Sequence, residues 1–521
     1  MTYDLEALDF ENIRRSLKQF SCTCYGNESI SHLEPAPNIS VARIMQSSVS
    51  AARECIDKGV ELNLGDVPNI RVALKQLSTT NGIVNTQALY NILLVLNASQ
   101  QLLDTIQINP ALYPSSMPGL SIPVEVITVI NKTVNESGRL RFDASLKLES
   151  LNQEMTQLKS EAENLIKQTI RENDLRSYVV DSKPVWQGER AVIAVYSSHL
   201  EKIKGVIKGS QSGGSHQLVE PIVVMAKNNE MERLSQKIRA EQNEILKSVT
   251  QTARDYLTEL NQLLDAIAWV DIAFAAGKLS AQMNAHAPEL VESAEIVLNK
   301  AYHPMLLIQF IQGRVAQPVP LSIRVMRDKP FVLITGPNTG GKTVVLKTVG
   351  LLQLMAQCGL HIPAEENCTL GWFNTVLVDM GDKQSMYHQL STFAGHIEVM
   401  KHILQNANEK SLFLLDELGT GTDPEEGAAL AMATIDQLIE KNSMGIVNTH
   451  LAPLKEYGSQ HERVQNASMV FDENRLSPTY QLEMGKNGKS FGLVIAERNG
   501  LPREVTQKAE SYLESIQNQT K

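Results

Sequence analysis

Apolar and polar residues follow two different patterns along this chain. From Leu5 to about Val134, apolar residues recur at spacings of three and four, which places them on one face of an α-helix. From about Glu292 onward, short apolar runs alternate with helical segments, the pattern of an α/β domain. Four of these runs predict buried strands, at residues 331–334, 375–378, 412–415 and 445–448. The chain is therefore predicted to join a helical N-terminal part to an α/β C-terminal part.

The middle of the chain carries two further helical runs in a strongly charged background. One begins near Leu148 and the other at Met231, and both space their apolar residues as coiled coils do. Between them lies an insert, residues 178–229, whose glycines separate three short apolar runs. These runs predict strands at residues 192–196, 203–207 and 218–225. We expect the two helices to lie antiparallel as an arm, with the insert forming a small β tip.

Composition narrows the possible classes of protein. The 521 residues are enough for roughly three or four domains at about 150 residues each. A formal net charge of −10 argues against a protein that coats nucleic acid with its whole surface, so such a contact needs a local basic patch. Within the insert, basic residues outnumber acidic ones. The basic residues are Lys183, Arg190, Lys202, Lys204 and Lys208, and the acidic residues are Asp181, Glu189 and Glu201. The insert could therefore contact a phosphate backbone, although solvated lysines explain the same pattern equally well.

The cysteines and the N-terminus indicate the compartment. Five scattered cysteines, an odd number, form neither a disulfide framework nor a four-ligand zinc site, so a reducing compartment fits them best. The N-terminus lacks the basic and apolar regions of an export signal, and no apolar run approaches the roughly 20 residues of a membrane span. We therefore expect a soluble, cytoplasmic protein with no membrane partner.

Residues 336–343 have the sequence Gly-Pro-Asn-Thr-Gly-Gly-Lys-Thr, a complete phosphate-binding loop between the predicted strand 331–334 and a helix. Gly340 and Gly341 let the main chain approach a triphosphate closely because they carry no Cβ. Lys342 is expected to reach the β- and γ-phosphates, and the Thr343 hydroxyl is the expected magnesium ligand. The sequence thus predicts a nucleotide site formed by Gly336, Pro337, Asn338, Thr339, Gly340, Gly341, Lys342, Thr343 and Val344.

Hydrolysis of a nucleoside triphosphate also needs an acid that holds magnesium and a group that activates water. Asp416 and Glu417 follow the apolar residues 412–415 and supply both, because Asp416 would bind magnesium through water and Glu417 would be the base. Paired acids can also cap a helix or end a strand. His450 ends another apolar strand, where its imidazole could sense the γ-phosphate, although a single histidine there can equally be structural.

Ser391 and Thr392 open a helix between these motifs, and either hydroxyl suits an N-cap. Capping is compatible with a second role, because a helix N-terminus can also be offered to a phosphate held by a partner subunit.

Taken together, these residues resemble the MutS family of DNA-repair ATPases. The resemblance rests on residues 335–343, 390–393, 416–422, 449–450, 489–492 and 500–502. Within the family, residues 381–385, 391–396 and 421–424 are similar to the second bacterial branch, MutS-two. The likeness is sharpest in the ATPase domain and extends more loosely to the N-terminal helices and to the arm.

The resemblance implies a multidomain α plus α/β fold. It consists of a helical core with a coiled-coil lever arm and a small β clamp, followed by an ABC-type P-loop ATPase domain and a C-terminal helix-turn-helix. The corresponding segments are 1–140 (first part of the helical core), 141–177 (lever-arm helix), 178–229 (β clamp tip), 230–291 (returning arm and core helices), 292–480 (ATPase domain) and 481–521 (C-terminal dimerisation segment).

The resemblance also implies an activity and partners. A head-to-tail homodimer would hold each ATP and its Mg²⁺ between the phosphate loop of one subunit and Ser391 of the other. Glu417, His450 and Lys342 would be the catalytic residues that convert ATP and water to ADP and phosphate, with Thr343 and Asp416 on the metal. The implied ligand is branched, mismatched or distorted DNA, in repair or in suppression of recombination. The alternative is a ribosome-associated ATPase that senses stalled or collided ribosomes.

The chain departs from the family pattern in two places. Mismatch-reading MutS proteins begin with a separate domain that inserts an aromatic wedge beside the faulty base, whereas here helical spacing starts near Leu5. MutS-two proteins continue past the ATPase domain into a linker and a small Smr nuclease domain, whereas this sequence ends at Lys521. We therefore expect neither direct mismatch recognition nor nuclease activity, unless the sequence is a fragment of a longer protein.

The assignment of Glu417 as the base gives a first prediction. Glu417→Gln keeps the size and hydrogen bonding of the side chain but removes its basicity, so ATP binding is preserved while turnover is abolished. Binding of a fluorescent ATP analogue and phosphate release measure the two effects separately. Unchanged turnover in this variant would refute the assignment.

Overall fold

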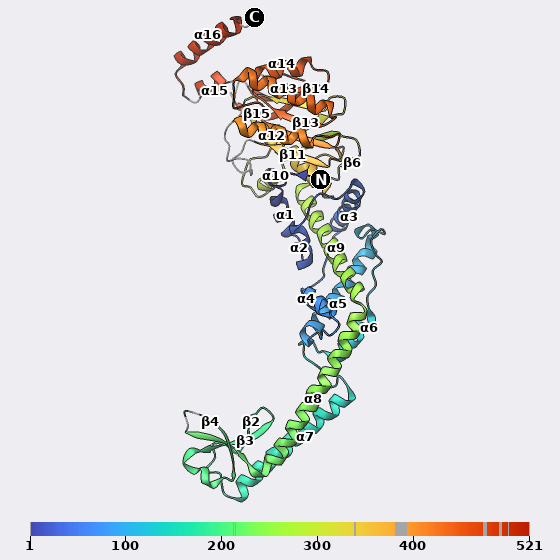
Figure 1. Cartoon of the computed structure of the whole chain (residues 1–521), viewed down its shortest axis with the longest axis vertical. Helices are drawn as coiled ribbons and strands as arrows, with labels where there is room; N and C mark the ends of the chain where they lie inside the picture. Colours follow the sequence, from blue (N-terminus) through green and yellow to red (C-terminus); the bar gives the residue numbers. More distant parts are fainter. Residues whose placement is uncertain are drawn as a thin grey trace. The chain divides into compact units, whose positions relative to one another are not determined.

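The computed structural model describes the whole chain except residues 1, 212, 214, 338–339, 381–392, 473–476, 489–491, 499 and 520–521. The chain forms two compact units, both drawn in Figure 1. The first unit comprises Met1–Asn63, Leu102–Met117 and Ala266–Lys521, and the second comprises Leu64–Gln101 and Pro118–Asp265. The predicted segment 1–140 contributes residues to both units. The six-segment division of the chain stays a prediction.

A seven-stranded sheet is the centre of the first unit. Its strand order is β1-β11-β12-β13-β9-β14-β15, and every described neighbour pair except β14–β15 is parallel. The strands are β1 (Thr2–Tyr3), β9 (Phe331–Thr335), β11 (Thr375–Asp379), β12 (Ser411–Asp416), β13 (Met444–Asn448), β14 (Val464–Asp472) and β15 (Ser477–Met484). The four strands predicted from apolar runs are confirmed as β9, β11, β12 and β13. Their sequences are continuously apolar because both faces of a parallel sheet are buried.

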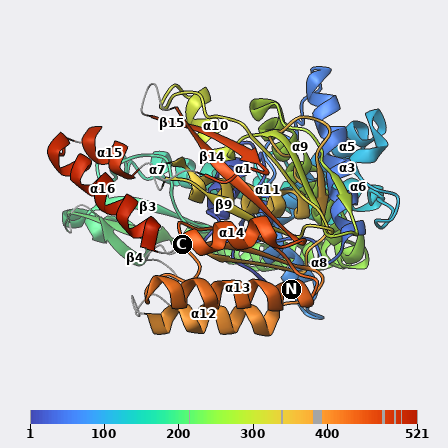
Figure 2. The ribbon, with the colours of Figure 1, turned by 90° about the horizontal axis from the view of Figure 1, so that it is seen from above.

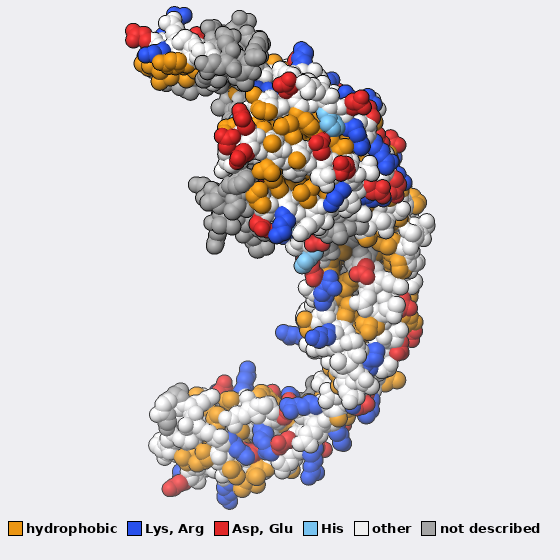
Figure 3. Space-filling view, turned by 45° about the horizontal axis from the view of Figure 1, so that its top comes forward, with side chains coloured by type: hydrophobic (Ala, Val, Ile, Leu, Met, Phe, Trp, Pro, Cys, Tyr) orange, Lys and Arg blue, Asp and Glu red, His pale blue; other side chains and the backbone are white. Residues whose placement is uncertain are grey.

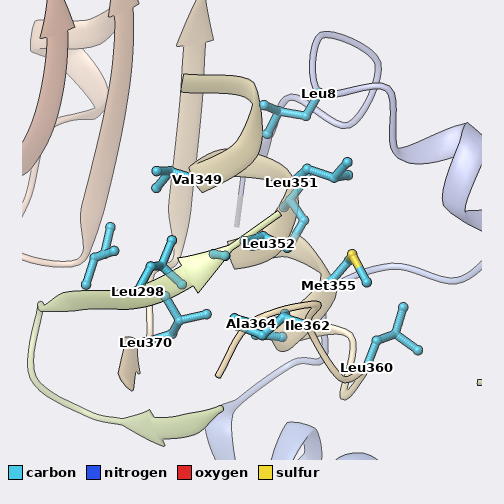
Figure 4. Close-up of a cluster of buried hydrophobic side chains, with 14 of the residues drawn as sticks. Leu8, Leu298, Val349, Leu351, Leu352, Met355, Leu360, Ile362, Ala364 and Leu370 are labelled. Atoms are coloured by element: carbon cyan, nitrogen blue, oxygen red, sulfur yellow. The ribbon is translucent and has the colours of Figure 1, made fainter. Parts of the chain in front are cut away.

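Helices cover both faces of this sheet. Helix α11 (Lys342–Gln357) is buried along almost its whole length in one hydrophobic cluster, whereas α12 (Phe393–Asn406), α13 (Pro424–Glu440) and α14 (Ala452–Gln460) contribute to another. Figure 2 shows α12 and α13 side by side. The first cluster also joins a second sheet of order β6-β10-β7-β8 to α11. Figure 4 shows this junction, where Leu298 and Leu370 lie near Leu352.

The strands of the second sheet are short. They are β6 (Glu289–Val291), β7 (Ile296–Ala301), β8 (Leu321–Val325) and β10 (Thr369–Gly371), with the helix α10 (Pro304–Ile311) between β7 and β8. The helices that come before this sheet in the chain are α1 (Phe10–Lys18), α2 (Cys24–Ser31), α3 (Ile39–Asp57), η1 (Pro110–Leu112) and α9 (Leu257–Met283), and the last two helices of the chain are α15 (Gly492–Arg498) and α16 (Arg503–Gln519).

The first residues of the chain belong to the seven-stranded sheet, which the helical spacing from Leu5 onward did not predict. Thr2 and Tyr3 pair in parallel with β11. The Tyr3 hydroxyl donates to the Phe373 carbonyl (3.1 Å), and the Asp4 carboxylate accepts from the Val378 N–H (2.8 Å). Two residues are too few to show a strand period, so the pairing could not be predicted from spacing.

The second unit contains a long helix pair and a small sheet. Its helices are α4 (Arg71–Leu77), α5 (Thr86–Ile108), α6 (Val124–Thr133), α7 (Leu146–Glu172) and α8 (Ile222–Asp255). Ion pairs Lys147–Glu241 (2.6 Å) and Glu161–Lys227 (2.7 Å) join α7 and α8, so the two helices run antiparallel, as predicted. Their apolar stripes share one buried cluster.

The β tip is a four-stranded antiparallel sheet of order β2-β3-β5-β4, with a short helix η2 (Ser197–Lys202). The strands are β2 (Val185–Gln187), β3 (Arg190–Tyr196), β4 (Gly205–Gln211) and β5 (His216–Pro221). The predicted strand 218–225 was wrong in its second half, because α8 begins at Ile222. Val224, Asn228 and Met231 are buried while Ile222 and Val223 are exposed, which is helical spacing.

The mixed α plus α/β class with a helical N-terminal region is confirmed. The finer terms, a lever arm, a clamp and a C-terminal helix-turn-helix, stay predictions. Among the helices that the structure describes, none is both long enough and apolar enough to span a membrane.

Candidate nucleotide-binding site

Three adjacent parallel strands end at the same edge of the large sheet. Strand β13 pairs with β12 on one side, with Asp416 opposite Asn448, and with β9 on the other, with Ile334 opposite Asn448. The phosphate loop follows β9, Asp416 is the last residue of β12, and His450 lies two residues beyond β13. Ligands of open α/β sheets bind at the carboxyl ends of strands, which is where the predicted site residues gather.

The phosphate loop has the backbone that its glycines permit. Gly336 and Gly341 have φ angles of 132° and 90°, which side chains with a Cβ rarely adopt. A Cβ on Gly341 would lie 3.2 Å from the Tyr480 ring, and one on Gly340 would lie 3.2 Å from the Met469 Cβ. Gly341 precedes the first residue of α11, so the N-terminus of this helix faces the loop.

Lys342 is a buried cation at the start of α11. Its side chain is almost inaccessible, and Nζ donates to the Gly336 carbonyl (2.7 Å). Burial lowers the pKa of Lys342, and the nearby Asp416 and Glu417 carboxylates partly oppose that effect. A buried ammonium beside a glycine-rich loop is suited to bind an anion such as a phosphate.

Thr343, Asp416 and Asn448 form a chain of hydrogen bonds beside Lys342. The Thr343 hydroxyl donates to Asp416 Oδ2 (2.6 Å), and Asn448 Nδ2 donates to Asp416 Oδ1 (3.1 Å). Within the described part of the chain, the buried Asn448 Oδ1 accepts no hydrogen bond. Hydroxyl and carboxylate oxygens are ligands that Mg²⁺ prefers, and this metal usually completes its shell with water and substrate phosphates. These residues therefore fit a magnesium ion that is bound together with a phosphate.

No cluster of three or more His, Cys, Asp or Glu side chains suited to a metal is found among the described residues. Thr343 and Asp416 thus offer one hydroxyl and one carboxylate, and bound water and a substrate phosphate would complete the shell of a metal ion here. Such a shell is typical of Mg²⁺ sites in phosphoryl-transfer enzymes.

Glu417 directly follows Asp416 and His450 lies two residues after Asn448, and both are more exposed to solvent than those two residues. His450 Nδ1 is 3.8 Å from Glu417 Oε1, and both side chains are roughly half exposed. Glu417 has a φ of 56°, a left-handed conformation that is uncommon outside glycine, and its N–H donates to the Asn448 carbonyl (3.1 Å). Its neighbour Asp416 is only 8% exposed, whereas 43% of the Glu417 side chain is exposed. The two acids thus have different surroundings, one buried and one open to water.

The structure brings Gly336, Gly340, Gly341, Lys342, Thr343, Asp416, Glu417 and His450 together at one edge of the sheet, with Pro337 in the loop and Val344 on α11. Asn338, Thr339 and Ser391 lie outside the described residues. The role of Ser391 in a partner's site therefore stays a prediction.

Sequence reasoning missed two residues of this site. Asn448 was read only as the end of an apolar strand, although a buried amide directly before Thr449 was a signal for a polar contact at that edge. Tyr480 on β15 is 54% exposed and lies against Gly341, and nothing in its local sequence indicated this position.

Comparison with known proteins identifies similar sequences. Residues 332–517 match the family model described as MutS domain V. The chain is 33% identical over 525 residues to "Endonuclease MutS2" of Halothermothrix orenii, which covers 96% of this chain and 64% of that protein. It is 33% identical over 515 residues to the protein of the same name from Lactobacillus helveticus, with 98% and 64% covered. The chain thus spans somewhat less than two thirds of the length of these relatives.

The position of Asn448 gives a second prediction. Asn448→Ala removes the hydrogen bond that orients Asp416, so nucleotide binding should need about ten times more Mg²⁺. Binding in EDTA should change little, because Lys342 and the loop are untouched. Fluorescence titration of an ATP analogue against MgCl₂ measures the shift, with the exposed Gln437→Ala on α13 as control. An equal loss of binding with and without Mg²⁺ would contradict a role in metal binding.

Proposed function

The chain belongs to the MutS family of ATPases and is similar to MutS2 proteins, and on that premise we propose that it is a dimeric, ATP-driven clamp for branched, mismatched or otherwise distorted DNA. In this proposal, hydrolysis of ATP resets a grip on DNA during repair or suppression of recombination. The protein would act in the reducing cytoplasm, in keeping with five cysteines that form no disulfide.

The observation that carries the proposed activity is the convergence of Lys342, Thr343 and Asp416 at one sheet edge. Bound Mg-ATP would supply the phosphoryl group, and Lys342 would offset part of its negative charge. Lys342 would bind the β- and γ-phosphates, and Thr343 and Asp416 would hold the metal. Asn448 would keep Asp416 in the orientation that its hydrogen bond now fixes.

Glu417 is the residue best placed to activate water. Its carboxylate is open to solvent, while Asp416 is buried and already hydrogen-bonded. His450, 3.8 Å away, would hold the proton-accepting carboxylate in place and respond to the γ-phosphate. Both proposed roles, activation of water by Glu417 and the response of His450 to the γ-phosphate, would depend on the left-handed backbone at Glu417.

The β tip is the proposed DNA contact, but two of its basic side chains are already paired with an acid of the tip itself. Arg190 and Lys208 both bind the buried Glu220, at 2.7 and 3.0 Å. The exposed Lys183, Lys202 and Lys204 are therefore the basic residues that support a phosphate-backbone contact. Figure 3 shows basic side chains on this part of the surface.

Helix α16 supports the proposed homodimer. Val505, Tyr512 and Leu513 each expose half or more of their side chains on this helix, and Leu501 precedes it with 43% exposed. Apolar side chains gathered on one short segment favour a protein contact. In the proposed head-to-tail dimer, Ser391 of the partner subunit would complete each nucleotide site. The absence of nuclease activity stays a prediction.

The proposed function predicts which ligand changes the ATPase rate. Four-way DNA junctions should raise or lower the steady-state rate several-fold more than a matched perfect duplex of equal length, while Lys342→Ala should show no turnover with any ligand. Phosphate release is measured with perfect duplex, mismatched duplex, four-way junction and purified ribosomes. A response to ribosomes alone, with co-sedimentation, would replace DNA by the ribosome as the ligand.

The dimer gives a further prediction. Leu513→Asp places a charge on the exposed apolar face of α16 and should weaken self-association about ten-fold or more, because a buried unpaired carboxylate is costly. Sedimentation velocity over a concentration series with Mg-ATP measures the effect. Glu510→Gln changes a charge on the same helix without adding one, and it should leave association nearly unchanged. A wild-type chain that stays monomeric at high concentration would refute the dimer.

A further inference from the structure

Residues 485–488 connect β15 to the C-terminal helices and are bonded to the same half of the sheet that carries the nucleotide site. We name this segment the clasp. Gly485 N–H donates to the Asn466 carbonyl (2.7 Å), and Asn487 Nδ2 donates to Ser459 Oγ (2.9 Å). Asn466 and Ser459 belong to β14 and α14, so the start and the middle of the clasp are fixed to two neighbouring elements.

The end of the clasp lies directly on the phosphate loop. Thr335, fully buried, is the last residue of β9 and precedes Gly336. Its hydroxyl accepts from the Gly488 N–H (2.9 Å) and donates to the Ala467 carbonyl (3.2 Å). A Cβ on Gly488 would lie 2.8 Å from Thr335 Oγ1 and 3.1 Å from the Gly336 nitrogen. Only glycine fits here, because the two main chains approach each other so closely.

A second cation joins the clasp to the site. Lys455 Nζ on α14 donates to the Gly488 carbonyl (3.2 Å). Burial lowers the pKa of Lys455, and its charge in turn contributes to lowering the pKa of Lys342. Lys342 donates to the Gly336 carbonyl and Lys455 to the Gly488 carbonyl, so the two ammonium groups lie on the two segments that Thr335 joins. An anion bound by Lys342 would therefore also attract Lys455.

We infer that the clasp is a nucleotide-responsive joint, in which the Thr335 hydroxyl and Lys455 pass a change at the phosphate loop to helices α15 and α16. A shift of Gly336 would be passed to Gly488, because the hydroxyl of the adjacent Thr335 accepts the Gly488 N–H. A bound phosphate that attracts Lys455 would break its hydrogen bond to the Gly488 carbonyl, and the clasp would then be held less firmly at Gly488. This inference rests on the proposed function, because it assumes that the loop binds a nucleotide.

The competing explanation is that the clasp only fastens β15 to the sheet. Loss of a buried hydroxyl would then lower stability but would not change how the C-terminal helices respond to nucleotide. Amide hydrogen exchange separates the two, because it reports local opening with and without ligand. Residues 485–488 and 503–519 are the segments to follow.

The test uses the full chain with Mg²⁺ and a non-hydrolysable ATP analogue. Thr335→Val removes the hydroxyl and keeps the branched shape, and Thr335→Ser keeps the hydroxyl as the matched control. In wild type and Thr335→Ser, nucleotide should change exchange in both segments about ten-fold. In Thr335→Val, the analogue should still bind while the change in residues 503–519 disappears. An equal response in wild type and Thr335→Val would overturn the inference.

A second pair of variants keeps the test decisive if Thr335→Val does not fold. Lys455→Met retains the aliphatic stem without the charge, and Lys455→Arg retains the charge. Loss of the nucleotide-dependent exchange change in Lys455→Met, with recovery in Lys455→Arg, supports the joint. A wild-type chain that binds the analogue without any change in the clasp overturns the joint alone. A wild-type chain that does not bind the analogue overturns the proposed function, and the joint with it.

Discussion

The parallel pairing of β13 with β9 on one side and β12 on the other is the constraint on which the site depends. Neighbouring parallel strands deliver their carboxyl ends to one edge, so the register that places Asp416 opposite Asn448 also places both beside the loop after Ile334. The Thr343–Asp416 hydrogen bond then joins α11 to this edge. A shift of one residue in β12 would turn Asp416 to the opposite face of the sheet, away from Thr343.

Holding these groups together is unfavourable for stability in itself. A buried ammonium loses its hydration, and Lys342 recovers only part of that loss from the Gly336 carbonyl and the two carboxylates. Asn448 keeps a buried oxygen without a hydrogen bond in the described structure, and Glu417 adopts a left-handed backbone. Local rules are broken most often where a site is held ready for a ligand. The apolar strands and the buried α11 around this edge provide the stability that allows it.

The parts of the fold that sequence could predict are those in which the burial of an element sets the pattern of its own residues. Continuous apolar runs predicted the central strands, and the sequence motifs predicted which polar residues gather at one sheet edge, because both signals are local. The pairing of Thr2 and Tyr3 with β11 could not be predicted, since it joins residues far apart in the chain. The same reason explains why Tyr480 and Gly488 were missed. Each is brought near the loop by the antiparallel pairing of β15 with β14, and the neighbouring residues in sequence carry no phosphate motif.

The β tip illustrates how counting charges can mislead when partners are unknown. Glu220 is fully buried at the end of β5, and burial alone would raise its pKa, yet hydrogen bonds from Asn228, Lys208 and Arg190 keep that pKa below its usual value. Asn228 also binds both the N–H and the carbonyl of Ala191, each at 3.0 Å. These bonds fix β3 and β5 to α8, so the tip and the helix should move as one body. Two of the basic residues that suggested a nucleic-acid surface are thus needed to neutralise an internal acid. In the proposed contact with DNA, the exposed lysines of the tip would bind phosphates, and the bonds between the tip and α8 would hold these lysines in place.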